Sequence, residues 1–213
     1  MPLEWPMQSL SAEKLDSLLD RGYRRSGPFL YRTRCPACSA CEPTRIDIRE
    51  FSPTRSMRRV LNRGDRDLQI RIAAPSVDTD RIDLFNRHRL ERSLSREQGV
   101  VDESDYSGFL VDTICNTREI SYWLDDQLVG IATSDIGRES ISLVYCYFDP
   151  AASGYSVGTY SILKHIEFAR QWQMRYVYLG MYVSSNSHLN YKGRFLPQYR
   201  FQQGSWKKVT SQN

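Results

Sequence analysis

Three evenly spaced cysteines are the first residues in this sequence whose type and spacing could do chemistry. Cys35, Cys38 and Cys41 form a C-x-x-C-x-x-C pattern within RTRCPACSACEPTRI. Three thiolates at this spacing can surround one metal, but tetrahedral zinc and iron–sulfur clusters normally take four ligands. Cys115 and Cys146 are the candidates for a fourth. A zinc ion or cluster is therefore one hypothesis, and oxidation-sensitive thiols or plain structural packing are the alternatives.

Arginines surround these cysteines and give the first third of the chain a strong positive charge. Residues 21–71 contain thirteen arginines, no lysine and five acids, a net charge of +8, whereas the whole chain carries only +4. The rest of the chain is therefore net acidic, at −4. Arginine suits bidentate phosphate contacts better than lysine does. The segment predicts a polyanionic partner, and a solvated basic face is the alternative.

The elements that must position these residues can be read from hydrophobic periodicity and turn residues. Helices are expected at about residues 11–21, 52–64, 80–93 and 154–174. Strands are expected at 27–34, 44–48, 67–73, 141–149 and 175–183, with a hairpin at 119–137 that turns at Asp125-Asp126. The order hairpin, strand, helix, strand predicts an α+β fold with a helix packed on a sheet. The break at 74–80 places a boundary between a subdomain at 1–75 and another at 76–213.

Composition restricts the class of protein. Of 213 residues, 40% are hydrophobic and 12% aromatic, which excludes a disordered tail. No apolar run approaches the roughly 20 residues that cross a bilayer, so no membrane association is expected. The N-terminus lacks a basic head followed by an apolar stretch, so a secretory signal is not expected and the cytoplasm is the predicted location.

Several unusual sequence blocks together resemble one known family. They are GYRRSG, CPACSACEPTRI, YCYFDP, SVGTYSIL and YKGRFLP, which occur in this order between about residues 15 and 206. The chain resembles the N-end-rule aminoacyl-tRNA–protein transferases, which comprise eukaryotic arginyltransferases and shorter bacterial aspartate/glutamate leucyltransferases. Its length favours the bacterial branch. Bacterial relatives usually carry a further cysteine-containing segment before the first helix, so one expected source of metal ligands is missing here.

The resemblance implies a fold and an activity. The implied fold is a small basic N-terminal subdomain followed by a GNAT-like mixed-sheet catalytic subdomain. The implied reaction transfers leucine from leucyl-tRNA to the α-amine of proteins that begin with Asp or Glu, which creates a destabilising N-terminus for proteolysis. Its partners are aminoacyl-tRNA and the acidic acceptor protein. Aminolysis of an activated ester needs orientation and a proton route but no obligatory nucleophile, so no cofactor is required beyond the hypothetical cysteine-bound metal.

Candidate site residues follow from the blocks that carry the resemblance. Lys192 and Arg194 are expected to bind the acidic acceptor residue, and Tyr191 and His188 to stabilise the oxyanion or move a proton together with Lys192. The glycine-poor start of the 154–174 helix, with Ser156, Gly158 and Thr159, is expected to bind the substrate's terminal adenosine or phosphates. The alternatives are structural roles: Ser153 or Ser156 could simply cap the helix, and Tyr191 and Phe195 could pack in the core. Contacts with tRNA are expected from the densest arginine runs: Arg24, Arg25, Arg55, Arg58 and Arg59.

Three other functions remain open from the sequence. The alternative most similar to leucyl transfer is arginyl transfer from arginyl-tRNA to the same acceptors. No residue in the sequence indicates which donor side chain is recognised. An acetyl-CoA-dependent N-acetyltransferase is disfavoured by the sparse glycines at the helix start. A non-enzymatic, metal-bound nucleic-acid-binding module would leave the second half of the chain without a role.

Overall fold

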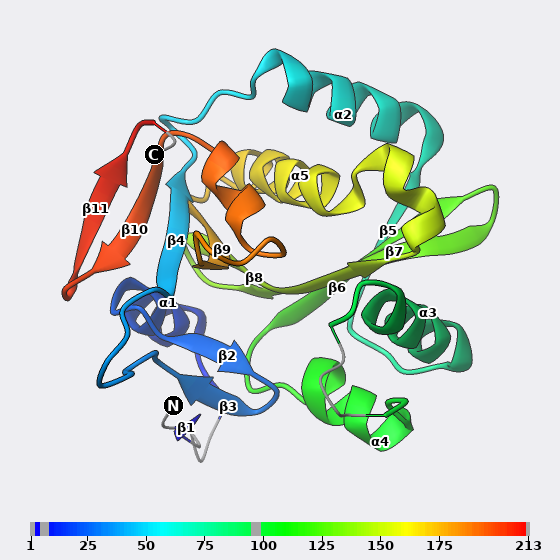
Figure 1. Ribbon diagram of the computed structural model, residues 1–213, viewed down its shortest axis with the longest axis horizontal. Helices are drawn as coiled ribbons and strands as arrows, with labels where there is room; N and C mark the ends of the chain where they lie inside the picture. The colour runs from blue at the N-terminus through cyan, green and yellow to red at the C-terminus, as the bar shows by residue number, and fades with distance from the viewer. Residues whose placement is uncertain (1–2, 5–8, 95–98, 212–213) are drawn as a thin grey trace.

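The computed structural model describes residues 3–4, 9–94 and 99–211. Its centre is an eight-stranded mixed sheet in the order β11-β10-β4-β9-β8-β7-β6-β5 (Figure 1). These strands are β4 (Glu42–Asp47), β5 (Gln69–Ala73), β6 (Thr117–Leu124), β7 (Gln127–Ile136), β8 (Ser140–Phe148), β9 (Tyr176–Tyr182), β10 (Gln198–Gln202) and β11 (Ser205–Val209). Neighbouring strands are antiparallel except β8 and β9, which are parallel.

Helices cover both faces of this sheet. On one face α5 (Val157–Gln171) lies against β8 and β9, and α2 (Arg55–Asp67) packs over α5 (Figure 1). On the other face lie α3 (Thr79–Glu91), α4 (Glu103–Tyr106) and the π-helical turn η1 (Ser107–Val111). Neighbouring residues of β7 divide between the two layers: Ile131 packs under α3, while Ala132 belongs to the α5 core. This is the period-2 alternation that a sheet buried on both faces requires.

The N-terminal segment adds a small sheet at the side of the large one. Helix α1 (Ala12–Asp20) begins at Ser11, whose hydroxyl accepts a hydrogen bond from the N–H of Lys14 at 3.2 Å. It is followed by the hairpin of β2 (Arg24–Ser26) and β3 (Phe29–Tyr31), and β1 (Leu3–Glu4) pairs with β3. Leu15 and Leu19 of α1 pack on Tyr178 of β9, so α1 is anchored to the large sheet.

The sequence-based elements agree closely with the structure. The four expected helices correspond to α1, α2, α3 and α5, and the expected strands and hairpin correspond to β3 to β9. The α+β prediction with a mixed sheet is confirmed. The hairpin of β10 and β11 was not predicted, because QYRFQ and SWKKV are short, polar strands at the sheet edge without a hydrophobic run.

The proposed boundary at residues 75 and 76 falls between β5 and α3. However, β4 and β5, which precede it, belong to the same eight-stranded sheet as the strands that follow it. The two segments therefore share one sheet, and their division into subdomains stays a prediction. Across the described ranges, none of the helices combines the length and apolar character needed to cross a membrane.

Candidate active site

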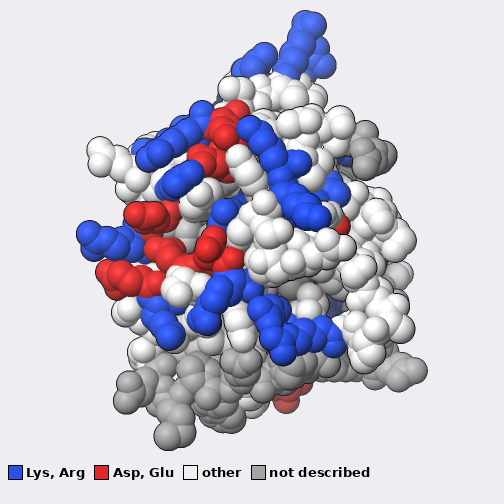
Figure 2. All heavy atoms as spheres, turned by 90° about the vertical axis from the view of Figure 1, so that its left-hand side faces the viewer, with Lys and Arg blue, Asp and Glu red and all other residues white. Residues whose placement is uncertain are grey.

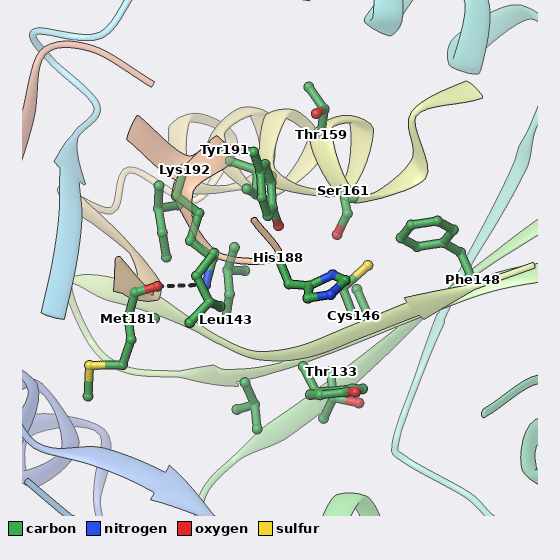
Figure 3. A pocket seen from close by; sticks show the side chains of 18 of the residues that line it. Thr133, Leu143, Cys146, Phe148, Thr159, Ser161, Met181, His188, Tyr191 and Lys192 are labelled. Carbon is green, nitrogen blue, oxygen red and sulfur yellow. Dashed lines mark hydrogen bonds between the residues drawn. The ribbon is translucent and has the colours of Figure 1, made fainter. Parts of the chain in front are cut away.

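A cavity of about 730 Å³ opens where β8 and β9 separate. The two strands pair only from Ser140–Ser142 with Tyr176–Tyr178. Beyond this point β8 stays with β7 as far as Phe148, whereas β9 stays with β4 as far as Tyr182. The open wedge between them is lined by both strands, the start of α5 and the segment 188–192 that contains part of the 3-10 turn η3 (Asn190–Arg194) (Figure 3).

The first turn of α5 forms one wall of the cavity. Ser156, Gly158 and Thr159, all expected at a substrate site, line it. Ser156 adopts a left-handed conformation with φ of 51° and is the N-cap of α5, but its side chain makes no capping hydrogen bond. Capping by the Ser156 hydroxyl is therefore not its role in this structure. The first N–H groups of a helix have no partner within the helix, and they carry partial positive charge that suits an anion.

Two cations meet beside Gly180 at the apex of the wedge. The Lys192 ammonium donates to the carbonyl oxygen of Met181 at 3.0 Å (Figure 3), and Arg24 Nη2 donates to the carbonyl oxygen of Leu143 at 2.7 Å. A Cβ added to Gly180 would lie 3.2 Å from Lys192 Nζ and 3.4 Å from Arg24 Nη2. Burial first, and then the neighbouring Arg24 guanidinium, lower the pKa of Lys192 to about 7.

The two other predicted catalytic residues also line this cavity. Tyr191 points into it from η3, and its hydroxyl oxygen is near the first turn of α5, at 3.7 Å from the Cβ position of Gly158 (Figure 3). Burial raises the pKa of Tyr191, so its phenol is a proton donor at neutral pH. His188 Nδ1 lies 3.3 Å from Arg92 Nη2, which orients the ring in the cavity.

Cys146, on the wall formed by β8, is the one cysteine that lines the cavity among the described residues. His188 lines the same cavity (Figure 3). Burial raises the pKa of the Cys146 thiol to about 12, so the thiolate that a nucleophile requires is scarce at neutral pH. The site thus resembles a binding and positioning cavity more than a cysteine nucleophile with its base.

Three of the five arginines predicted to bind tRNA are exposed. Arg55, Arg58 and Arg59 lie on α2. Figure 2 shows basic side chains projecting at the top of the molecule, where α2 lies, and a mixture of basic and acidic side chains over β10, β11 and α1. This exposed arginine group on α2 is accessible to phosphates, and tRNA binding by it stays a prediction.

Arg24 and Arg25 occupy a different environment from the α2 arginines. Both are buried, with 5% and 7% of their surface exposed. Arg25 forms a buried, bidentate ion pair with Asp135 at 2.7 and 2.9 Å, and Arg24 points into the cavity wall. Their burial removes them from the surface on which a tRNA backbone would lie. Arg194, predicted to bind the acceptor, is exposed and does not line the cavity.

The three cysteines of the opening motif lie apart from the cavity. Cys35, Cys38 and Cys41 are exposed, free cysteines. The main chains of Cys35 and Cys38 form an isolated antiparallel β-bridge, which is not a disulfide. Partial burial, and then the neighbouring Cys38 and Cys35, raise the pKa of Cys41, which disfavours its thiolate. Among the residues that the structure describes, no group of three or more His, Cys, Asp or Glu side chains is arranged to hold a metal ion. The arrangement present therefore does not fit the hypothetical zinc or cluster.

Sequence reasoning missed the part that Arg24 and Gly180 play in the cavity. Gly180 has a φ of 89°, a left-handed conformation that favours glycine, and both cations lie near the space that a side chain would fill. A lone glycine within a strand pattern can mark such a close approach, so the LGMY segment carried a usable signal. The position of Arg24 had no such signal, because its strand is short and joins a different sheet.

Comparison with known proteins identifies the fold and the family. The chain is similar to FemX, with a TM-score of 0.56, 9% identity and coverage of 92% of this chain and 68% of that one. It is also similar to the C-terminal domain of a putative lysylphosphatidylglycerol synthetase from Agrobacterium fabrum, with a TM-score of 0.54, 16% identity and coverage of 85% and 57%. Together with the parted parallel strands and the helix between them, these likenesses show a GNAT-like fold, as predicted.

The family follows from the sequence matches. Residues 3–59 match the model of the arginine-tRNA-protein transferase N terminus, and residues 80–202 match that of its C terminus. The chain is 34% identical to the aspartate/glutamate leucyltransferase of Aeromonas hydrophila, over 95% of this chain and 84% of that protein. It is likewise 34% identical to that of Nitrobacter hamburgensis, over 95% and 82%. The chain belongs to the arginine-tRNA-protein transferase family and is an aminoacyltransferase, as the resemblance implied.

Proposed function

We propose that this protein transfers leucine from leucyl-tRNA to the α-amine of proteins that begin with Asp or Glu. The observation that carries this proposal is the charge of the cavity wall. Arg24, Arg92 and Lys192 line the cavity, whereas none of its described lining residues is Asp or Glu. A site of this charge suits an anionic acceptor residue and a donor group without a positive side chain. The names of the relatives at 34% identity point to the same donor and acceptors.

The lack of a lining carboxylate favours leucine over arginine as the donor residue. A guanidinium taken out of water needs a carboxylate or several acceptors to offset its desolvation, and here it would meet other cations. A leucyl side chain needs only apolar surface, which Leu143, Phe148 and Ile162 provide. The same argument applies to an N-terminal Lys or Arg as acceptor, which the cationic wall would repel.

The reaction forms one bond and breaks one. The neutral α-amine of the acceptor attacks the carbonyl carbon of the aminoacyl ester, a C–N bond forms, and the C–O bond to the terminal ribose breaks. The amine loses a proton and the ribose oxygen gains one, so the balance needs no cofactor. Holding the two reactants together in the cavity can supply ~7–11 kcal/mol of the barrier reduction.

His188 and Tyr191 are the groups in the cavity best suited to this proton movement. His188 lines the cavity and carries an imidazole, a group that can accept the proton of the attacking amine. Tyr191, whose pKa is raised, can donate a hydrogen bond to the ester oxyanion or to the leaving ribose oxygen. Lys192 supplies positive charge to the acceptor side of the same space.

The tRNA body would lie over α2, whose exposed arginines can contact phosphates. Helix α2 packs on α5, and the first turn of α5 lines the cavity, so a tRNA on α2 could extend its charged end toward the site. Because the reaction consumes charged tRNA, it would take place in the cytoplasm. The leucylated product would carry a destabilising N-terminus.

The test incubates the purified protein with tRNA charged with radiolabelled leucine or arginine and with peptides that begin with Asp, Glu or Ala. Labelled leucine on the Asp and Glu peptides, with little on the Ala peptide, is the expected result. No label on either acidic peptide would refute the proposal, and efficient transfer of arginine would refute its donor. Turnover of acetyl-CoA without tRNA would instead support an N-acetyltransferase.

A further inference from the structure

We infer that Arg24 and Lys192 together bind the side-chain carboxylate of the acceptor's first residue, at the apex of the wedge between β8 and β9. This inference rests on the proposed function and assigns its acceptor specificity to one pair of residues. The pair joins two segments far apart in the sequence, β2 and η3. It keeps Lys192 in the acceptor-binding role that the sequence predicted, replaces Arg194 by Arg24 there, and removes Arg24 from the predicted tRNA contacts.

The hydrogen bonds of the two cations leave donors free for a ligand. Arg24 Nη2 is held by the Leu143 carbonyl of β8, and Lys192 Nζ by the Met181 carbonyl of β9. Arg24 Nη1 is buried and has no hydrogen-bond partner among the described residues. An ammonium has three donors and a guanidinium five, so each cation is fixed by a main-chain carbonyl and retains further N–H groups. A carboxylate, with two oxygens, can accept from both.

Among the described residues, no Asp or Glu lines the cavity beside the pair. Asp135, a carboxylate whose charge acts on Arg24, is engaged by Arg25 and by the hydroxyl of Thr117 at 2.7 Å. The buried Arg24 and the half-buried Lys192 repel each other when both are charged, and their separation from water makes the repulsion stronger. An incoming anion would relieve this repulsion, whereas a neutral amide of the same shape would not. The pair therefore favours Asp over Asn and Glu over Gln.

A side-chain carboxylate suits this position better than a phosphate of the tRNA. Arg24 is 5% exposed and belongs to the wall of the cavity, beside Gly180. A carboxylate is a small group at the end of a short chain and can reach such a place. A phosphodiester carries a ribose on each side and needs an open surface, which the arginines of α2 provide.

The experiment measures binding of peptides that begin with Asp or Asn by calorimetry, without tRNA, in the wild type and in Arg24→Gln and Lys192→Gln. The wild type should bind the Asp peptide more tightly than the Asn peptide, and each variant should reduce this preference by about 10- to 100-fold, since a charge-assisted hydrogen bond is lost. Arg118→Gln, which removes an exposed arginine of β6 outside the cavity, is the matched control. Circular dichroism and thermal unfolding verify that each variant is folded.

The outcomes separate this inference from the proposed function. An Asp preference that survives in Arg24→Gln overturns the inference, as does a wild type that binds both peptides equally. A preference lost in Arg194→Gln and kept in Arg24→Gln would assign recognition to the exposed turn and also overturn it. Weaker binding of charged tRNA with an unchanged Asp preference would make the pair a phosphate site instead. A normal preference for the Asp peptide without leucyl transfer would refute the proposed function alone and would support carboxylate binding by Arg24 and Lys192.

Discussion

Arg25 and Asp135, 110 residues apart in the sequence, form a bidentate ion pair in which each side chain is only 1% exposed. Arg25 also donates to the carbonyl oxygen of Gly27 at 2.9 Å, and Asp135 accepts from Thr117. The pair thus fastens the small β2–β3 hairpin to β7 of the large sheet. Because Arg24 precedes Arg25 in β2, this ion pair also fixes where Arg24 enters the cavity wall.

Removing one partner of this ion pair should destabilise the fold strongly. Asp135→Ala leaves the Arg25 guanidinium buried and unpaired, and we expect a loss of about 3–5 kcal/mol in the free energy of unfolding, measured with urea. Arg138→Ala, which breaks the exposed contact with Glu13, is the control and should cost less than about 1 kcal/mol. Equal losses in the two variants would show that the buried pair does not fasten the hairpin.

Adding a methyl group to Gly180 should disturb the site as well as the strand. Gly180→Ala places a side chain at a φ of 89° and within 3.2 Å of Lys192 Nζ. We expect a stability loss of about 1 kcal/mol or more. We also expect roughly 10-fold weaker binding of an Asp peptide, because the two cations are pushed apart. Gly108→Ala, where an added Cβ meets nothing within 4 Å, should change neither measurement appreciably.

The charge of Lys192 should lower the free energy of unfolding, although the residue serves the site. Its pKa is about 7 in the folded state and 10.5 when freely solvated. Between these values the unfolded chain binds one more proton than the folded chain, so this residue makes stability rise with pH from about 7 to 10.5. Lys192→Met removes a half-buried charge and should raise the free energy of unfolding at pH 6 by about 1 kcal/mol or more, with a smaller gain at pH 9. A gain that is larger at pH 9 would contradict this pKa.

The arginines of α2 should contribute affinity for tRNA that depends on salt. The double variant Arg55→Gln/Arg59→Gln should weaken binding of leucyl-tRNA and reduce the slope of log K against log salt by about 1 per lost phosphate contact. Binding of an Asp peptide should be unaffected. A filter-binding titration over several salt concentrations measures the slope. An unchanged slope would place the tRNA on another surface.

The cysteine motif should be dispensable for transfer. Cys38 is exposed and does not line the cavity, so Cys38→Ser should retain leucyl transfer within about 3-fold. Metal analysis of the native protein and of this variant tests the zinc or cluster hypothesis at the same time. One metal per chain in the native protein, lost together with activity in Cys38→Ser, would restore the motif as a metal centre.

Local elements were readable from the sequence because local patterns specify them. The apolar stripe of α5 follows the 3.6-residue period, and Ser11 caps α1 as its position before the first apolar residue predicts. The family was readable too, because unusual blocks such as YKGRFLP occur in order. These blocks placed Tyr191, Lys192 and His188 at the site, and the structure brings all three to one cavity.

The roles of the arginines could not be read in the same way, because charge and spacing do not report burial. In the sequence, Arg24, Arg25 and the arginines of α2 belong to one basic segment. In the fold, Arg25 finds Asp135 and Arg24 finds the Leu143 carbonyl, both more than 100 residues away. The sequence by itself therefore determined most of the elements, the family and several of the cavity residues. The tertiary structure decided which cations remain on the surface and which two lie together in the cavity, because long-range strand pairing determines which distant residues become neighbours.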